Sequence, residues 1–151
     1  MPQSLAQVYL HIIFSTQQRQ PFLLNPATRG SVHAYLAGIL QNLETPASCI
    51  GGVEDHVHIL CRFGRTRTIS DVVRDCKRDS SKWIKSAFSD LAAFDWQNGY
   101  GTFSISSGHV EALREYITHQ EHHHQRETFQ EEYRRLLEKH NLEYDERYVW
   151  D

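Results

Sequence analysis

Hydrophobic and polar positions along the first part of the chain alternate between the periods of a strand and of a helix. Residues 5–15 (LAQVYLHIIFS) are rich in β-branched and aromatic side chains, which predicts a strand. Over residues 27–43 the apolar side chains instead recur every three or four positions, as in an amphipathic helix. Residues 47–63 (ASCIGGVEDHVHILCRF) then predict two strands, with Gly51 and Gly52 as a bulge or a turn.

The remaining pattern completes one recognisable order of elements. A second helix is predicted over about 69–88, and a strand at 100–105 (YGTFSI). Two further helices are predicted over 108–124 and near 129–140. The order strand, helix, strand, strand, helix, strand is typical of a ferredoxin-like α+β fold. We therefore expect an antiparallel sheet with helices on one face, followed by C-terminal helices.

Hydroxyl side chains mark the expected helix starts. Thr68 opens a capping-box pattern before the second helix. We expect Ser107 to cap the helix over 108–124. Thr128 and Glu131 have the spacing of a capping box at the start of the last helix.

Composition narrows the class of protein. With 151 residues, 40% of them hydrophobic and 23% charged, the chain predicts a single folded domain over 1–151 rather than disorder. No apolar run approaches the ~18 residues that a membrane span needs, and the N-terminal residues lack the basic start of a leader peptide. The three cysteines form no CxxC pair and no disulfide framework, so we expect a cytoplasmic protein with no membrane partner.

Charge is distributed unevenly along the chain. The net charge is −3, yet residues 62–85 contain eight Lys and Arg against three Asp. This local excess predicts a focused contact with an anionic ligand, although a solvated helix face explains it equally well. The candidate cations for phosphate contacts are Arg74, Lys77, Arg78, Lys82 and Lys85.

The segment Asp55-His56-Val57-His58-Ile59-Leu60 contains the sharpest local motif. Side chains alternate along a strand, so His56 and His58 share one face while Val57 and Ile59 point to the core. Two imidazoles on one face can converge on a single divalent metal ion. Two surface histidines on a polar strand face are the plainer interpretation of this short motif.

Tyr116 and Gln120 are four residues apart in a predicted helix and are therefore neighbours on one helix face. A tyrosine hydroxyl is a poor nucleophile at neutral pH unless a nearby metal or base activates it. A half-buried core tyrosine is the competing interpretation. The histidine run His122–His124 nearby can bind transition metals, but it lacks the HExxH spacing of a metalloprotease.

Together these segments resemble a known family. The order of the HVH strand, the basic helix, GYGTFSIS and YITHQ resembles the IS200/IS605-type single-tyrosine transposases, which are HUH endonucleases of the Y1 class, and their REP-associated relatives. The resemblance extends over about residues 5–149. The stretch WQNGYGTFSISSGHVEALREYITHQEHHH carries it best, because it places the tyrosine helix in the family's context.

The resemblance implies an activity and a role for particular residues. It implies cleavage and rejoining of single-stranded DNA with hairpin ends through a 5′-phosphotyrosine. Tyr116 would be the catalytic nucleophile, and His56, His58 and Gln120 would bind Mg²⁺ or Mn²⁺. His123, one turn further along, would be an additional or alternative ligand.

The resemblance also implies a homodimer, since one tyrosine makes one cleavage and transposition needs paired cleavages. The first strand at 5–15 or the C-terminal helices would form the dimer contact. Members of the family can place the tyrosine helix of one subunit against the HUH strand of its partner. Other functions stay open. A ferredoxin-like module that binds single-stranded nucleic acid without cutting it is one, although no RNP1 pattern is present. A tyrosine nuclease with a host role and a zinc hydrolase built on the histidine run are the others.

Overall fold

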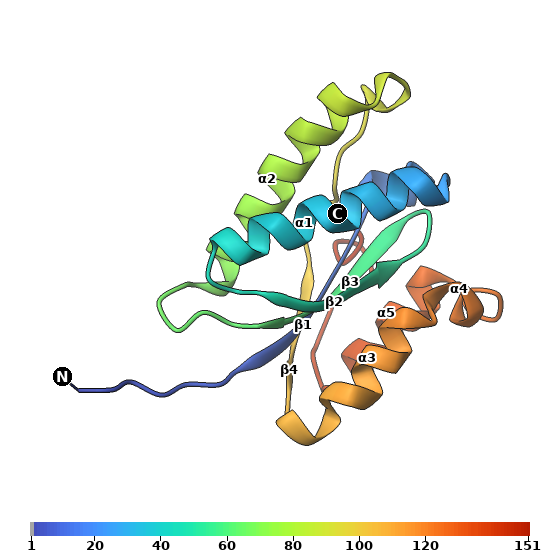
Figure 1. Ribbon diagram of the computed structural model, residues 1–151. Helices are drawn as coiled ribbons and strands as arrows, with labels where there is room; N and C mark the ends of the chain where they lie inside the picture. The colour runs from blue at the N-terminus through green and yellow to red at the C-terminus, as the bar shows by residue number, and fades with distance from the viewer. Residues whose placement is uncertain (1) are drawn as a thin grey trace.

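Four strands pair in the order β2-β3-β1-β4 in the computed structural model, which describes residues 2–151 (Figure 1). The central strands are β1 (Tyr9–Ser15) and β3 (His56–Arg62), and the edge strands are β2 (Ala47–Gly52) and β4 (Gly101–Ile105). Every neighbouring pair is antiparallel. This strand order, with its two crossover helices, confirms the predicted ferredoxin-like α+β class.

The helices cover the two faces of the sheet separately. Helices α1 (Pro26–Asn42) and α2 (Ile69–Ala87) bury their apolar stripes against one face, as predicted. The C-terminal helices α3 (Val110–Thr118), α4 (Gln120–His123) and α5 (Phe129–Lys139) lie on the other face (Figure 1). Three short 3₁₀ turns complete the described elements: η1 (Gln17–Arg19), η2 (Ser89–Leu91) and η3 (Ser107–His109).

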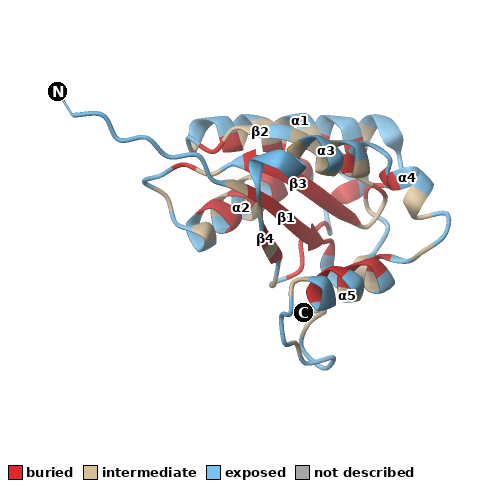
Figure 2. Cartoon of the chain, turned by 90° about the horizontal axis from the view of Figure 1, so that it is seen from below, coloured by how far each residue is buried: buried red, intermediate tan, exposed pale blue. Residues whose placement is uncertain are grey.

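Strand β3 belongs to both layers because its side chains alternate. Val57 and Ile59 enter the larger core beneath α1 and α2, as the sequence predicts. His56 and His58 point to the opposite face, and both are fully buried there. Figure 2 shows that β1 and β3 are buried along nearly their whole length, so the two histidines lie inside the protein rather than on its surface.

Three local expectations were wrong. The first strand begins at Tyr9 rather than at residue 5, because its two neighbouring strands end opposite Tyr9. Gly51 and Gly52 lie within β2, and the irregular pairing falls near Ala47 instead. The predicted helix over 108–124 breaks at His119 into α3 and α4.

The expected helix caps are found at two of three starts. Thr68 accepts a hydrogen bond from the backbone N–H of Asp71, and Thr128 forms the complete capping box with Glu131. Ser107 does not cap α3, because it begins the 3₁₀ turn η3. Well-formed caps fix where α2 and α5 start, and α5 carries residues of the site described below.

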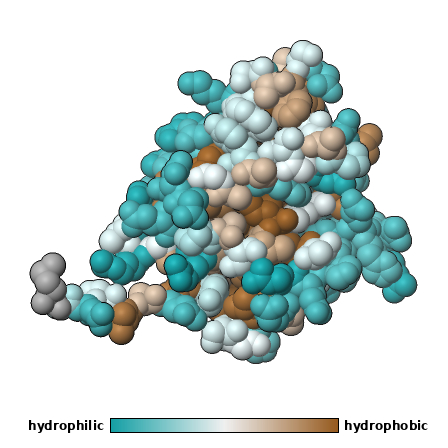
Figure 3. Space-filling view, in the orientation of Figure 1, coloured by the Kyte–Doolittle hydropathy of each residue, from teal (hydrophilic) through white to brown (hydrophobic). Residues whose placement is uncertain are grey.

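The face drawn in Figure 3 is mostly hydrophilic, with hydrophobic residues visible near the middle and in smaller groups at the top and bottom. Large exposed apolar side chains are scattered over the described surface: Leu5, Val8, Leu24, Tyr100, Leu142 and Tyr148. Within residues 2–151, no helix has the length and apolar character that crossing a membrane requires.

Candidate functional site

The two strand histidines form the base of the site. The rings of His56 and His58 have centroids 5.1 Å apart, and neither side chain is exposed to solvent. Their Nδ1 atoms face supporting groups within the fold. His56 Nδ1 lies 2.7 Å from Asp55 Oδ1, and His58 Nδ1 lies 2.8 Å from His11 Nε2. Such partners fix the orientation of each ring and leave its Nε2 atom to face the site.

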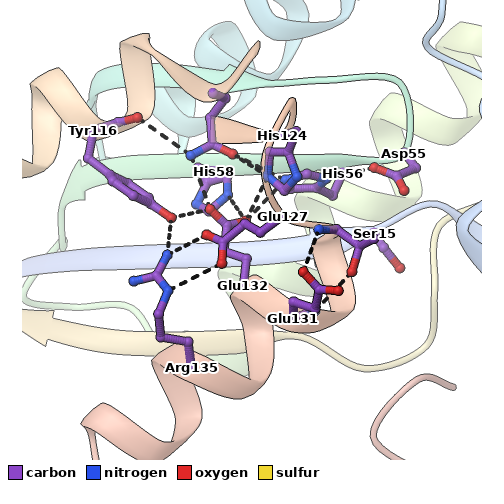
Figure 4. A network of polar contacts seen from close by, with 12 residues as sticks. Ser15, Asp55, His56, His58, Tyr116, His124, Glu127, Glu131, Glu132 and Arg135 are labelled. Carbon is purple, nitrogen blue, oxygen red and sulfur yellow. Dashed lines mark hydrogen bonds and ion pairs between the residues drawn. The ribbon is translucent and has the colours of Figure 1, made fainter. Parts of the chain in front are cut away.

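Glu132 of α5 closes the site from the opposite side. Its Oε1 atom lies 2.9 Å from His58 Nε2, 3.1 Å from His124 Nε2 and 3.3 Å from His56 Nε2 (Figure 4). One donor atom from each of these four residues lies within 4.8 Å of the others. Three imidazoles and a carboxylate are a donor set that suits a divalent metal ion, so the residues present fit such an ion.

Gln120 joins the same cluster from α4. The side chain is buried, and its Oε1 atom lies 3.2 Å from His56 Nε2 and 3.0 Å from His124 Nε2. Its amide nitrogen donates to Glu132 Oε2 at 3.3 Å. The structure therefore brings together His56, His58 and Gln120, the three ligands that the resemblance implies, and adds His124 and Glu132.

Tyr116 lies at the edge of this cluster. Its hydroxyl donates to Glu132 Oε2 and accepts a hydrogen bond of 2.8 Å from Arg135 Nη2 (Figure 4). Its ring centroid is 6.0 Å from that of His58. One carboxylate thus contacts the tyrosine hydroxyl with one oxygen and the histidines with the other.

Burial and charge set the protonation of these groups. Burial and the adjacent carboxylate raise the pKa of Tyr116 well above its usual value, against the opposing effect of Arg135. Burial lowers the pKa of His58. Burial also acts to lower the pKa of His56, but hydrogen bonds to Asp55 and Glu132 outweigh it and raise that pKa to about 9. The hydroxyl therefore stays protonated at neutral pH unless positive charge is brought to it.

Glu132 itself remains ionised although it is buried. Burial alone raises the pKa of a carboxyl group, but the three histidines around Glu132 lower it far below the usual range. An ionised carboxylate only accepts hydrogen bonds, which matches its contacts to the Tyr116 hydroxyl and the Gln120 amide.

The histidine run contributes one residue, and it is not the expected one. His124 joins the cluster, whereas the ring of His123 stacks on Tyr116 with centroids 4.5 Å apart. His122 is exposed. His123 and His124 both lie near residues of the site: His124 contacts Gln120 and Glu132, and His123 contacts only the ring of Tyr116 among the site residues named above. The run does not form a metal site by itself.

The basic residues of α2 lie on the other face of the sheet from this cluster. Arg74 pairs with Asp71 and Asp75, and Arg78 pairs with Asp75 and Asp79.

Lys77 of the same helix is held by the backbone. Its Nζ atom donates to the carbonyl oxygens of Gln97, Asn98 and Gly99, and burial lowers its pKa to about 8. Lys82 and Lys85 are exposed and, within residues 2–151, have no hydrogen-bonded or ionic partner. They are the candidate phosphate contacts of α2 that are available to a ligand.

Three residues near the centre of the site were missed from the sequence, His11, Glu132 and Arg135, and His124 was named only as part of the histidine run. The position of Glu132 in the sequence could have identified it. It lies three residues after Phe129 and four before Leu136, both buried, so a carboxylate occupies the apolar stripe of an amphipathic helix. Lone acids are rarely buried without a partner, and such a position predicts a bound cation or a polar cluster.

Comparisons with known proteins agree with this fold. The sequence pattern of the family described as "Transposase IS200 like" matches residues 4–120. A solved structure from Deinococcus radiodurans R1, described as a candidate transposase, aligns with a TM-score of 0.64 and 22% identity, covering 80% of this chain and 95% of that one. A REP-associated tyrosine transposase bound to a REP hairpin aligns with a TM-score of 0.60 and 12% identity, covering 82% of this chain and 73% of that one. No curated protein sequence matches the chain.

Proposed function

Because the chain belongs to the family of IS200-like transposases, we propose that it cleaves and rejoins single-stranded DNA through a covalent link to Tyr116. The observation that carries this proposal is the shared carboxylate. Glu132 contacts the Tyr116 hydroxyl with one oxygen and three histidine Nε2 atoms with the other. A nucleophile and a metal-binding cluster therefore lie side by side within one chain.

The metal-binding residues in this proposal are His56, His58 and Gln120, with Glu132 and His124 of the same cluster as further ligands. The ion is Mg²⁺ or Mn²⁺, since Gln120 and Glu132 supply the oxygen atoms that these ions prefer. A bound divalent ion supplies positive charge that polarises a phosphate and stabilises charge developing on it. Asp55 and His11 keep the two histidine rings in place for this task.

The covalent step is a transesterification at one backbone phosphate. The hydroxyl oxygen of Tyr116 attacks the phosphorus in line, the bond from phosphorus to the 3′ oxygen breaks, and a 5′-phosphotyrosine forms. The proton lost by Tyr116 is balanced by the proton gained at the departing 3′-hydroxyl. Arg135 is placed to assist, because a cation at 2.8 Å stabilises negative charge on the tyrosine oxygen.

We further propose that α2 contacts the DNA backbone, chiefly through Lys82 and Lys85. These ammonium groups are exposed, and phosphate contacts position a protein on DNA without reading sequence. The solved relative described as bound to a REP hairpin supports DNA with a hairpin as the ligand class.

Paired cleavages need two tyrosines, so a homodimer is part of the proposal. Strand β1 is hydrogen-bonded on both sides within its own sheet, but residues 5–8 precede it, and Leu5 and Val8 are exposed there. The N-terminal segment and the C-terminal helices both stay candidates for the dimer contact. Light scattering with gel filtration tests the proposal, and a monomer that is active at every concentration would contradict it.

The decisive experiment measures a covalent adduct. The protein is incubated with Mg²⁺ or Mn²⁺ and labelled single-stranded hairpin oligonucleotides from the DNA that flanks its gene. We expect an SDS-resistant protein–DNA adduct that is absent in Tyr116→Phe, absent with EDTA and retained in Tyr148→Phe, which alters an exposed tyrosine. An adduct that survives Tyr116→Phe would refute the assigned nucleophile. Binding without any adduct would favour a non-catalytic single-strand binding protein.

A further inference from the structure

A cavity of about 590 Å³ opens beside Tyr116, between α3, α5 and the end of β4. This volume lies within the range of sites for small organic ligands. Tyr116 and the supporting residue His11 both line it, so a molecule in the cavity lies against Tyr116. None of the metal-ligand candidates lines it, which makes it a separate space adjoining the cluster.

The walls of this α3–α5 pocket are apolar and ring-bearing. Ile105, Leu113 and Leu136 provide aliphatic surface, and His109 and His140 provide imidazole rings. The ring of His140 is held in place by stacking on Phe103, with centroids 4.5 Å apart and an interplanar angle of 23°. Flat rings between aliphatic side chains suit a planar heterocycle, because every nucleobase has a face that stacks.

The charged side chains that line the pocket are cations. Arg135 and Lys139 lie one turn apart on α5 and both line it, whereas no Asp or Glu among the described residues does. Arg135 is paired with Glu127 at 2.7 Å, so Lys139 is the cation that is available to a ligand without breaking an ion pair. Arg135 also contacts the Tyr116 hydroxyl, which places a cation where the attacked phosphate has to arrive. Lys139, one turn further on, suits a second phosphate along the same strand.

We propose that the α3–α5 pocket binds one of the two nucleosides that are joined to the phosphate that Tyr116 attacks. The base of this nucleoside lies between α3 and α5, and the phosphates on its 3′ and 5′ sides contact Arg135 and Lys139. This inference rests on the proposed function and names the part of the substrate that is held at the tyrosine. It also makes the pocket a determinant of which nucleotide is cleaved.

The test measures binding without cleavage. Thymidine 3′,5′-bisphosphate, thymidine and inorganic phosphate are each titrated into the full chain in EDTA, and the response is followed by calorimetry and amide NMR shifts. We expect the bisphosphate to bind at least tenfold more tightly than inorganic phosphate, with shifts at Leu113 and Leu136. Ala112→Phe fills the pocket from an exposed position of α3 and should weaken the bisphosphate at least tenfold.

Matched variants distinguish a blocked pocket from a damaged fold. Glu115→Phe adds the same ring at an exposed position of α3 that does not line the pocket, and it should leave binding unchanged. Lys139→Ala should weaken the bisphosphate but not thymidine, and it serves if Ala112→Phe fails to fold. Equal affinity for inorganic phosphate and the bisphosphate would contradict the proposed nucleoside site. So would bisphosphate binding by Ala112→Phe that equals that of the unaltered protein. So would the absence of any saturable shift at millimolar bisphosphate.

Failure of the pocket and failure of the proposed function give different results. If Tyr116 forms the DNA adduct but Ala112→Phe binds the bisphosphate normally, only the pocket assignment is wrong. If the bisphosphate binds as expected and no adduct forms with any metal, the pocket is correct and the cleavage proposal is wrong.

Discussion

Glu132 is the residue on which the geometry of the site depends most. It is fully buried on α5, and its two oxygens contact side chains from β3, α3 and α4. A buried carboxylate is retained only where its charge is compensated, and the surrounding imidazoles provide that compensation. Loss of this one charge is therefore expected to affect the candidate metal ligands and the tyrosine together.

Glu132→Gln tests this dependence. The substitution keeps the shape of the side chain and removes its charge, so we expect divalent metal affinity to fall at least about tenfold while the fold is retained. Mn²⁺ titration by calorimetry or paramagnetic relaxation measures the affinity. The control is Glu138→Gln, an exposed position of the same helix, which should match the unaltered protein. Equal affinity in both variants would remove Glu132 from the ligand set.

The sequence allowed part of this site to be predicted at the residue scale. His56 and His58 follow from alternation along one strand, which is a local property. Gln120 and Tyr116 came from the resemblance to the family rather than from spacing. Glu132 and Arg135 approach the others only when α5 packs on the sheet, and no local period encodes that packing.

Among the elements, the close approach of α3 to β2 places Tyr116. Gly51 pairs with His58 across the sheet, so the two residues share a face. A Cβ at Gly51 would lie 2.3 Å from the backbone oxygen of Ile117, the residue after Tyr116. Only a glycine therefore lets α3 lie against this part of the sheet.

Gly51→Ala is expected to destabilise the protein by about 1–3 kcal/mol, because a backbone atom of α3 has to move. The shift should also weaken adduct formation by Tyr116. Gly38→Ala is the matched control, since nothing lies near its added Cβ within helix α1. It should stabilise the protein by roughly 0.5–1 kcal/mol. Urea unfolding measures both, and the same sign for the two variants would contradict the argument.

The bounds of a helix could be predicted from the sequence where its apolar period and its capping residues indicate the same start. The spans of α1, α2 and α5 were predicted to within about two residues, since each has an apolar stripe. The break at His119 was not predicted. The polar residues around it give no periodic signal, and Gln120, the residue after the break, is buried against His56.

For the molecule as a whole, His33 makes stability depend on pH. It lies on α1, far along the chain from the metal-ligand candidates, and its Nε2 atom is buried without a hydrogen-bond partner in the described residues. Burial and the nearby Arg29 lower its pKa to about 4. The unfolded chain takes up this proton near pH 6.5. Stability from a neutral His33 is therefore lost as the pH falls from about 6.5 to about 4.

His33→Gln should reduce that acid-induced loss by at most about 3 kcal/mol, the value that corresponds to the shift in pKa. The measurement is the free energy of unfolding in urea at pH 7, 5.5 and 4.5. His122→Gln, at an exposed position, should leave the pH dependence unchanged. A slope that is identical in His33→Gln and the unaltered protein would show that other groups cause the loss.

The sheet separates the basic helix α2 on one face from Tyr116 and the histidine–Glu132 cluster on the other (Figure 1). Under the proposed function, DNA binding through α2 and cleavage at Tyr116 can therefore be altered independently. Replacing Lys82 and Lys85 with Gln removes two exposed charges. If both contact the stem of a bound hairpin, the slope of log affinity against log salt falls by up to about 1.8. Fluorescence anisotropy of a labelled hairpin at several salt concentrations gives this slope.

Replacing Arg74 and Arg78 with Gln should change the salt slope less, because both arginines already pair with aspartates of α2. At saturating DNA, the lysine variant should still form the Tyr116 adduct, since neither lysine approaches that hydroxyl. An unchanged salt slope in the lysine variant would show that the phosphate contacts lie outside Lys82 and Lys85.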